Sequence, residues 1–277
     1  MSTVRQAIHA AKEILQSEQA ARDAEFLMMH ALVISRAALL ASPGRELTAA
    51  ETASYNAFIA ERATGKPIQY ITGTQEFFGL ALAVNDAVLI PRPETEHLVE
   101  AVLARMPEDR ETSIVDVGAG SGAIAIALAH TRPQARVTAV DLSAEALDVA
   151  RRNAEAHGVA ARIRFLQSDL LSACGGEMFD AVVSNPPYIA DAERATLEVQ
   201  VREFEPAGAL FAGQSGYEVY ERLIPQAWNA LLPGGLLAME MGFGQSARLM
   251  ELLGAWREVE VVDDLQGIPR VVLARRG

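Results

Sequence analysis

The stretch that decides the fold is Ile114-Val115-Asp116-Val117-Gly118-Ala119-Gly120-Ser121-Gly122. Its first four residues are typical of a buried strand, and a helical pattern runs from residue 122 to 130. The glycines between them permit a tight turn and let the backbone approach a ligand closely. Backbone amides exposed where such a helix begins favour an anionic group. The stretch therefore predicts the first strand-turn-helix unit of an α/β domain, with a ligand-binding turn.

Strands and helices continue to alternate after this unit. A helix is predicted behind Ser143, which is placed as its N-cap, and another from residue 219 to 231. Alternation of this kind implies a mostly parallel, doubly wound, Rossmann-like sheet that is covered on both faces. We assign this α/β domain to residues 94–277. The further strands are predicted at residues 136–140, 162–166, 181–183, 235–239, 259–262 and 271–273.

Residues 1–66 have a helical pattern instead and predict a small N-terminal helical domain. Val4, Ile8 and Ala11 recur at helical spacing, and Thr48-Ala49-Ala50-Glu51 has the form of a capping box. Gly65-Lys66-Pro67 ends the last of these helices. Because the segment carries no cluster of reactive side chains, we predict a recognition or lid domain. The alternative is a purely stabilising cap.

Residues 67–93 form an apolar segment with a different period. Apolar residues from Ile68 and Tyr70 to Val84 suggest short strands, which are interrupted at Gly73 and Gly79. Two prolines near residue 92 stiffen the end of the segment, and the second is tolerated directly before a helix. We predict an ordered β-hairpin connector.

Composition and charge exclude several function classes. The 277 residues carry a net charge of −12, so the chain lacks the basic footprint of a duplex-binding protein, and we expect no direct nucleic-acid binding. An acidic surface favours a basic protein partner, although acidity also simply keeps proteins in solution. No stretch approaches the roughly 20 apolar residues that cross a bilayer, and the start of the chain has no secretory pattern. One cysteine, Cys174, and five histidines without ligand spacing predict no metal site. We expect a cytoplasmic protein without membrane attachment.

The glycine turn and one acidic residue predict a nucleotide-type cofactor. Asp141 ends the second strand, where its carboxylate can accept both hydroxyls of a ribose. S-adenosylmethionine fits, with its methionine carboxylate near the residues from Gly118 to Gly122. However, Gly118, Gly120 and Ala123 also satisfy the dinucleotide pattern G-x-G-x-x-G/A. On these residues alone a nicotinamide-dependent dehydrogenase remains nearly as good an interpretation.

A second loop, Asn185-Pro186-Pro187-Tyr188, follows the predicted strand at residues 181–183. Ligands bind beyond the carboxyl ends of parallel strands, so this loop should face the same crevice as the glycine turn. The Asn185 side-chain oxygen and the Pro186 carbonyl can each accept one N–H of a planar nitrogen and disperse the charge that grows on it. Tyr188 can stack on the planar group. A plain proline turn would leave Asn185 and Tyr188 unexplained.

These residue types fit methyl transfer to an amide or aromatic amino nitrogen. Rate then comes from alignment of nitrogen, methyl carbon and sulfur, and no dedicated general base is needed. Asp169 could accept the adenine amino group while Leu170 packs on the ring. Taken alone, Asp169 is equally suited to capping the next turn. The predicted catalytic residues are Asn185, Pro186 and Tyr188.

The two loops together resemble those of class I methyltransferases that act on amino groups and amides. Over nearly the whole chain, further segments resemble the peptide chain release factor glutamine methyltransferases: residues 69–73, 76–79, 204–206, 232–235 and above all Pro91-Arg92-Pro93-Glu94-Thr95-Glu96. The turn at residues 267–270 departs locally from that family, in which a more polar turn is expected.

This resemblance implies methylation of the glutamine amide in the Gly-Gly-Gln loop of class I release factors. Carried over, S-adenosylmethionine would contact the residues Gly118, Ala119, Gly120, Ser121, Gly122, Asp141, Asp169, Leu170 and Asn185. The glutamine would be held by Asn185, Pro186, Pro187 and Tyr188, and enclosed by Phe77 and Phe78, for which ordinary core packing is an equal alternative. The helical domain would dock the release factor.

Three other functions share parts of this pattern. A ribosomal-protein glutamine methyltransferase is the nearest, but its connector departs from residues 91–96. A DNA adenine N6-methyltransferase acts on a flipped base, but would be expected to carry a basic recognition region. A binding module without catalysis predicts donor binding without turnover, and the intact Asn185 counts against it.

Overall fold

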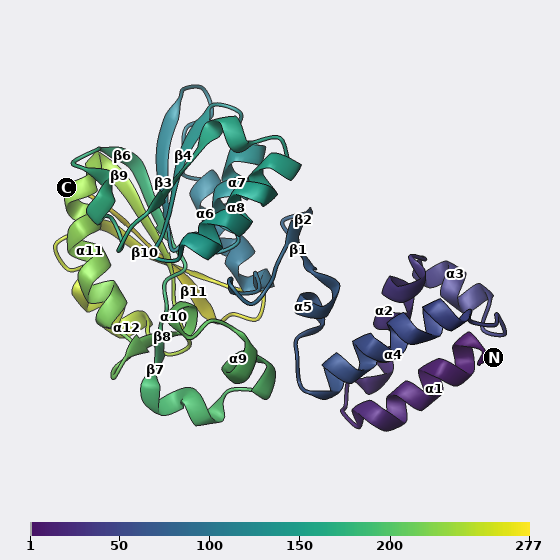
Figure 1. Cartoon of the computed structure of the whole chain (residues 1–277). Helices are drawn as coiled ribbons and strands as arrows, with labels where there is room; N and C mark the ends of the chain where they lie inside the picture. Colours follow the sequence, from purple (N-terminus) through teal and green to yellow (C-terminus); the bar gives the residue numbers. More distant parts are fainter. Residues whose placement is uncertain (1) are drawn as a thin grey trace. The chain divides into compact units, whose positions relative to one another are not determined.

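The computed structural model of the chain describes residues 2–277 and divides into two compact units (Figure 1). One unit contains the chain up to Gly73 together with Glu198–Phe204, and the other contains Thr74–Leu197 and Glu205–Gly277. Met1, the first residue of the predicted helical domain, lies outside the described residues. The boundaries 1–66, 67–93 and 94–277 stay a prediction.

The first unit is helical, as its sequence pattern predicts. Thr3 and Thr48 both close capping boxes, each accepting from a backbone amide three residues on while the side chain of that residue returns to the cap. Leu27 and Tyr55 lie in its apolar core, where the Tyr55 hydroxyl donates to the Ala24 carbonyl at 3.0 Å. Its helices are α1 (Val4–Leu15), α2 (Ala20–Leu32), α3 (Arg36–Ala41), α4 (Ala49–Ala63), α5 (Ile68–Thr72) and α9 (Val199–Phe204).

The strand predicted at Ile68 and Tyr70 is wrong, because these residues lie in the short helix α5. Pro67 sets the φ angle at the N-cap to −55°, and Gly73 ends the helix in the left-handed region at 73°. Ile68 and Ile71 lie three residues apart and both pack against the core of the first unit. The spacing of these apolar residues therefore belongs to one buried face of a helix.

The predicted connector hairpin is present and well packed. Strand β1 (Thr74–Phe77) pairs antiparallel with β2 (Leu80–Ala83). The two-residue turn between them, Phe78-Gly79, has positive φ at both positions, as hairpin turns of this length prefer. The Phe78 amide donates to the Glu96 carboxylate at 2.8 Å, and the Ala83 amide donates to the Asn153 side chain at 2.7 Å. The hairpin, which belongs to the second unit, is thus fastened to the rest of that unit.

The second unit is built on a seven-stranded, mostly parallel sheet, which confirms the predicted fold class. Its spatial order is β10-β11-β9-β6-β3-β4-β5, and only β11 runs antiparallel to its neighbours, β10 and β9. From β3 the chain proceeds outward through β4 and β5 on one side and then through β6 and β9 on the other, so the strand order reverses between β3 and β6. The strands are β3 (Thr112–Val117), β4 (Ala135–Asp141), β5 (Ile163–Gln167), β6 (Phe179–Ser184), β9 (Leu231–Glu240), β10 (Arg257–Asp263) and β11 (Pro269–Arg275).

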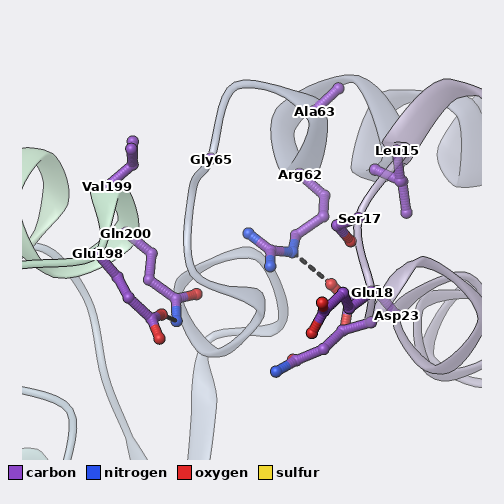
Figure 2. Close-up of a pocket in the computed structure, with 11 residues that line it drawn as sticks. Leu15, Ser17, Glu18, Asp23, Arg62, Ala63, Gly65, Glu198, Val199 and Gln200 are labelled. Carbon is purple, nitrogen blue, oxygen red and sulfur yellow. Dashed lines mark hydrogen bonds and ion pairs between the residues drawn. The ribbon is translucent and has the colours of Figure 1, made fainter.

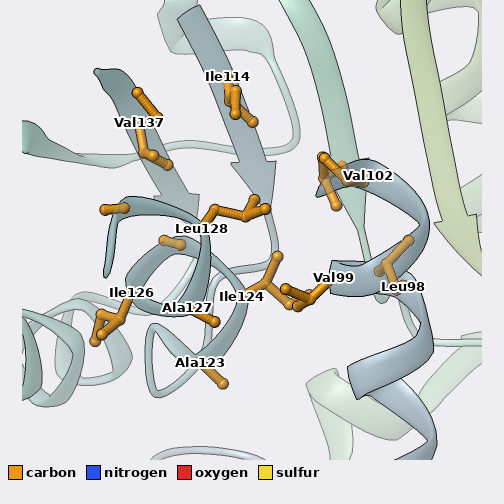
Figure 3. Packing of buried hydrophobic residues seen from close by; sticks show 14 of the residues in the cluster. Leu98, Val99, Val102, Ile114, Ala123, Ile124, Ile126, Ala127, Leu128 and Val137 are labelled. Carbon is orange, nitrogen blue, oxygen red and sulfur yellow. The ribbon is translucent and has the colours of Figure 1, made fainter. Parts of the chain in front are cut away.

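Helices cover both faces of this sheet (Figure 1). Along β3, Ile114 belongs to one apolar core, whereas Val115 and Val117 belong to the other, as the period of two in a strand requires. Figure 3 shows the first core, where α6 and α7 lie against β3 and β4. The second core lies between the opposite face and α11 and α12. The helices are α6 (Glu96–Leu103), α7 (Ala123–Thr131), α8 (Ala144–Ala156), α11 (Glu218–Ala230) and α12 (Ser246–Leu252).

One N-cap predicted for this unit is present in the structure. Ser143 does cap α8, as predicted, by accepting from the Ala146 amide at 3.1 Å. Within residues 2–277, no helix is long and apolar enough to span a membrane.

Several shorter elements in this unit had no clear pattern in the sequence. They are η1 (Pro93–Thr95), η2 (Ala160–Arg162), η3 (Ser172–Cys174), β7 (Ile189–Ala190), η4 (Asp191–Thr196), α10 (Ala207–Leu210) and β8 (Phe211–Gly213).

Candidate functional site

A cavity of about 530 Å³ lies at the carboxyl ends of β3, β4, β5 and β6. Gly118 and Gly120 line it together with Asn185 and Pro187, so the two loops of interest open onto one space. This is the position beside the strand-order reversal where open α/β sheets bind ligands. Its volume lies in the range of small-molecule and cofactor sites.

The glycine turn is held in shape by the strand beside it. The amides of Gly118 and Ala119 both donate to the Val140 carbonyl, at 2.9 and 3.0 Å. The Gly120 amide donates to Asp141 Oδ2 at 2.8 Å, and the Ser143 amide donates to Oδ1 at 2.9 Å. Each Asp141 oxygen keeps a second acceptor position, and the residue lines the cavity. The arrangement suits a pair of vicinal hydroxyls.

Leu170 and Asp169 lie on the wall of the cavity beyond β5. Leu170 has a φ of 50°, which is uncommon for a residue with a branched side chain. The Asp169 carboxylate forms an ion pair with Arg222 of α11 at 2.5 Å, with both side chains about half exposed. The Asp169 side chain is therefore paired with Arg222 in the wall of the cavity. The Asp169 backbone carbonyl accepts a hydrogen bond from the Ser172 amide.

The Asn185 side chain is the end of a buried chain of hydrogen bonds. Its Nδ2 donates to Thr95 Oγ1 at 3.0 Å, and Thr95 Oγ1 donates to Glu240 Oε2 at 2.6 Å. Thr95 is 4% exposed and Glu240 2% exposed. Burial raises the pKa of Glu240 to about 7, while the hydrogen bond from Thr95 opposes that rise.

Tyr188 lies behind the same loop, packed against the second apolar core. Burial raises the pKa of its hydroxyl well above the usual range, so this group is neutral at physiological pH. Gln245 Nε2 donates to the Tyr188 carbonyl at 3.0 Å, and a side chain at Gly242 would come within 2.9 Å of the tyrosine ring. The loop is therefore tightly held on the side away from the cavity.

Asp116 lies under the glycine turn, fully buried. Its Oδ2 accepts from the Ala125 amide at 3.0 Å, whereas Oδ1 has no hydrogen-bond partner among the described residues. Burial raises the pKa of this carboxyl to about 7. A buried acceptor without a partner is costly in a protein. Asp116 is not among the residues that line the cavity, so the fit to a nucleoside-type cofactor rests on the glycine turn and Asp141.

Known proteins resemble this chain along nearly all of its length. A family model described as PrmC N-terminal domain matches residues 6–73, and one described as Methyltransferase small domain matches residues 95–212. The release factor glutamine methyltransferase of Koribacter versatilis is 46% identical over 99% of both chains. That of Escherichia coli K12 is 41% identical over 96% of both chains. The chain belongs to the release factor glutamine methyltransferase family.

Solved structures with a similar fold are also methyltransferases. The human METTL16 catalytic domain in complex with an RNA hairpin has a TM-score of 0.56 at 20% identity, covering 78% of this chain and 81% of its own. A Thermus thermophilus 16S rRNA methyltransferase in complex with AdoMet and guanosine has a TM-score of 0.54 at 23% identity, covering 74% of this chain and 50% of its own. At such identities the likeness shows the fold alone.

Membership of this family confirms that the chain is a methyltransferase that uses S-adenosylmethionine. The alternative of a nicotinamide-dependent dehydrogenase, left open by the glycine turn, is wrong. The residues present fit the cofactor, because the cavity offers the turn amides, Asp141 for a ribose and Leu170 for a ring. The individual contacts stay predictions.

The structure separates the predicted site residues into two groups. Ala119 and Ser121 are buried at 6% and 3% exposure and are not among the residues that line the cavity. Phe77 is 1% exposed in the first core, which favours the packing alternative, and Phe78 is partly buried against that core. The predicted residues that line the cavity are Gly118, Gly120, Asp141, Asp169, Leu170, Asn185 and Pro187.

Gly122 lies where α7 and α8 pack closely, so a side chain at this position should lower the stability of the fold. A Cβ atom there would lie 3.0 Å from both Ala150 Cβ and Ile126 Cδ1, and φ is 81°. We expect Gly122→Ala to lower the free energy of unfolding by about 2–4 kcal/mol in urea titrations, from crowding between α7 and α8 plus left-handed strain. Gly158→Ala is the matched control, since φ is 68° and nothing lies within 4 Å. It should lose only about 1 kcal/mol, and equal losses would contradict the packing role.

A second cavity, of about 350 Å³, lies in the helical unit. Figure 2 shows Arg62 and Asp23 joined across it by an ion pair of 2.7 Å. Their side chains are 15% and 7% exposed, and the Arg62 guanidinium also donates to the Lys66 carbonyl. The pair joins α2 to α4 and therefore serves the packing of this unit.

Proposed function

We propose that the chain transfers a methyl group from S-adenosylmethionine to the side-chain amide nitrogen of the glutamine in the Gly-Gly-Gln loop of class I peptide chain release factors. The observation that carries this proposal is that Asn185 lines the same cavity as Gly118, Gly120 and Asp141. The cofactor cavity therefore includes one of the two proposed acceptors for a planar nitrogen, the Asn185 side chain, whereas Pro186 is not among its lining residues. The names of the relatives, at 40–46% identity, support the release factor as the substrate.

In this proposal the Asn185-Pro186-Pro187-Tyr188 loop binds the glutamine amide. The Asn185 side-chain oxygen and the Pro186 carbonyl each accept one N–H, which orients the nitrogen lone pair and disperses positive charge in the transition state. The prolines keep the carbonyl rigid. Tyr188, which was predicted to stack on the planar group, packs against the second apolar core and would support the loop from behind. When bound, the cofactor supplies an electrophilic methyl group on its sulfonium. The methylated nitrogen is acidic enough to lose its proton to water, so no general base is required.

The helical unit would bind the body of the release factor, and the reaction would belong to translation termination in the cytoplasm. The net charge of −12 favours a partner with basic surfaces. Protein docking outside the cavity would supply the binding energy that holds the glutamine in place. The same acidity disfavours DNA, since duplex binding relies on cationic contacts to phosphates.

Methyl transfer to alternative polymers tests the proposal directly. The protein is incubated with S-adenosylmethionine labelled in its methyl group and, in separate reactions, with a class I release factor, ribosomal proteins and duplex DNA. We expect label in the release factor only, with the added mass on the glutamine of the Gly-Gly-Gln loop. A Gln→Ala release factor should take up none. Label in ribosomal protein or DNA, or in the Gln→Ala release factor, would overturn the proposed substrate.

A further inference from the structure

We propose that Thr95 and Glu240 are positioning residues that determine which way round the Asn185 carboxamide faces its substrate, an inference that rests on the proposed function. The three side chains come from distant parts of the sequence. Thr95 ends the turn before α6, Glu240 ends β9, and Asn185 follows β6. Neither Thr95 nor Glu240 lines the cavity, so both act through Asn185.

The direction of the hydrogen bonds follows from the chemistry of the buried carboxylate. An ionised Glu240 is only an acceptor, so the Thr95 hydroxyl must donate its single proton to it at 2.6 Å. The Thr95 oxygen can then only accept from Asn185, at 3.0 Å, which requires Nδ2 to face it. Asn185 Oδ1 is therefore directed away from Thr95 and is free to accept from a substrate N–H.

The opposite orientation would be unproductive. A carboxamide turned by 180° would present Nδ2 to the N–H groups of the substrate, so two donors would meet. An asparagine in an open loop could exchange its two ends at little cost, because the oxygen and the NH₂ group are nearly equal in size. The chain of hydrogen bonds from Glu240 removes this freedom before the substrate arrives. Such preorganisation contributes to rate because the acceptor is already in place during methyl transfer.

The charge of Glu240 is what enforces the direction. Three groups face the Glu240 carboxylate: the guanidinium of Arg270, the carboxylate of Glu94 and the hydroxyl of Tyr188. The Tyr220 hydroxyl donates to the Glu240 backbone carbonyl at 2.9 Å. Burial raises the pKa of Glu240 to about 7, with Glu94 adding to the rise and Arg270 opposing it. Protonated Glu240 can donate to Thr95, which then donates to Asn185 Oδ1 and permits the unproductive orientation. Activity should therefore fall as the pH drops through about 7.

Variants of Thr95 separate positioning from folding. Thr95→Val keeps the shape but removes the hydroxyl, and we expect kcat to fall about 10–100-fold, corresponding to one lost orienting hydrogen bond. The KM for the release factor and the Kd for S-adenosylmethionine should stay within about twofold, because uniform binding is unaffected. Thr95→Ser restores the hydroxyl and should recover most of kcat. Thr112→Val is the matched control, a buried threonine at the start of β3, and should leave kcat unchanged.

Glu240→Gln tests the role of charge. A neutral glutamine can still accept from Thr95 but no longer enforces one direction. We expect a lower kcat that is flat between about pH 6 and pH 8, where the parent enzyme loses activity at the acid side. An acid-side loss with an unchanged midpoint in Glu240→Gln, or an unchanged kcat in Thr95→Val, would overturn the inference. Thermal unfolding of every variant identifies any loss that is due to misfolding, and Thr95→Ser then decides by recovery or failure.

The failure of this inference is distinguishable from failure of the proposed function. The parent enzyme is first assayed on release factor, ribosomal protein and DNA, and the variants are compared on whichever polymer takes the methyl group. Transfer to another planar nitrogen would refute the proposed substrate while still testing the orientation of Asn185. Transfer to the release factor with insensitive variants would leave the function intact and remove the positioning role.

Discussion

Asn185→Ala is expected to slow methyl transfer in a single turnover by about 30–1000-fold, equivalent to about 2–4 kcal/mol of transition-state stabilisation. The side-chain oxygen accepts from a nitrogen whose positive charge grows as the methyl group transfers, so its loss is felt most in the transition state. Rapid-quench assays with enzyme in excess over release factor measure this chemical step. Isothermal titration with S-adenosylmethionine should show a much smaller change in affinity.

Asn229→Ala provides the comparison for this prediction. Asn229 is an exposed residue of α11 and is not among the residues that line the cavity. Its replacement removes the same chemical group from the same unit, and the chemical step should be unchanged. An Asn185→Ala enzyme with the chemical rate of the parent would refute the role of the side-chain oxygen.

The fold could be predicted because its determinants are local or periodic. The pattern around the glycine turn identified β3 and α7, and the alternation after it identified the other central strands, since buried parallel strands form short apolar runs. Ser143 was recognised as an N-cap because the preference for this residue type depends on one turn of helix. Helix α5 was missed because five residues of apolar sequence between Pro67 and Gly73 are too short for the period to decide.

The site could be predicted only as far as its sequence motifs extend. Gly118, Asp141 and Asn185 follow strand ends and could be placed at one edge of the sheet from the order of elements alone. Thr95 and Glu240 could not, because Thr95 lies 90 residues from Asn185 and 145 residues from Glu240 in the sequence. A buried glutamate at the end of an apolar strand was the available signal, since such a residue needs a partner.

Arg92→Ala is expected to lower the free energy of unfolding by about 3–5 kcal/mol. Arg92 Nη2 donates to Glu205 Oε1 at 2.5 Å, and the Glu205 side chain is only 1% exposed. Removing the arginine leaves a buried carboxylate whose remaining partner is the Ile90 amide at 3.4 Å. Urea titration at pH 8 measures the loss. Arg248→Ala is the control, because its partners Glu221 and Glu251 are exposed, and it should lose at most about 1 kcal/mol.

The pH dependence of Arg92→Ala identifies the cause of that loss. Burial already raises the pKa of Glu205 and Arg92 lowers it, so the variant should have a higher pKa still. A carboxyl with a raised pKa in the folded state binds protons more readily than the unfolded chain, and stability therefore increases as the pH falls toward the unfolded value. The deficit relative to the parent should shrink from pH 8 to pH 5. A deficit independent of pH would indicate lost packing of the arginine stem instead.

Arg92→Ala should also affect activity, because the ion pair supports residues of the candidate site. The Arg92 carbonyl accepts from the Thr95 amide at 3.1 Å, so the ion pair anchors the turn that presents Thr95 to Asn185. Pro206 follows Glu205 and lines the cavity, which places the other end of the pair in the cofactor wall. We therefore expect Arg92→Ala to lower kcat and to weaken S-adenosylmethionine binding several-fold at temperatures where the protein remains folded. A loss of stability with both parameters unchanged would show that the ion pair serves the fold alone.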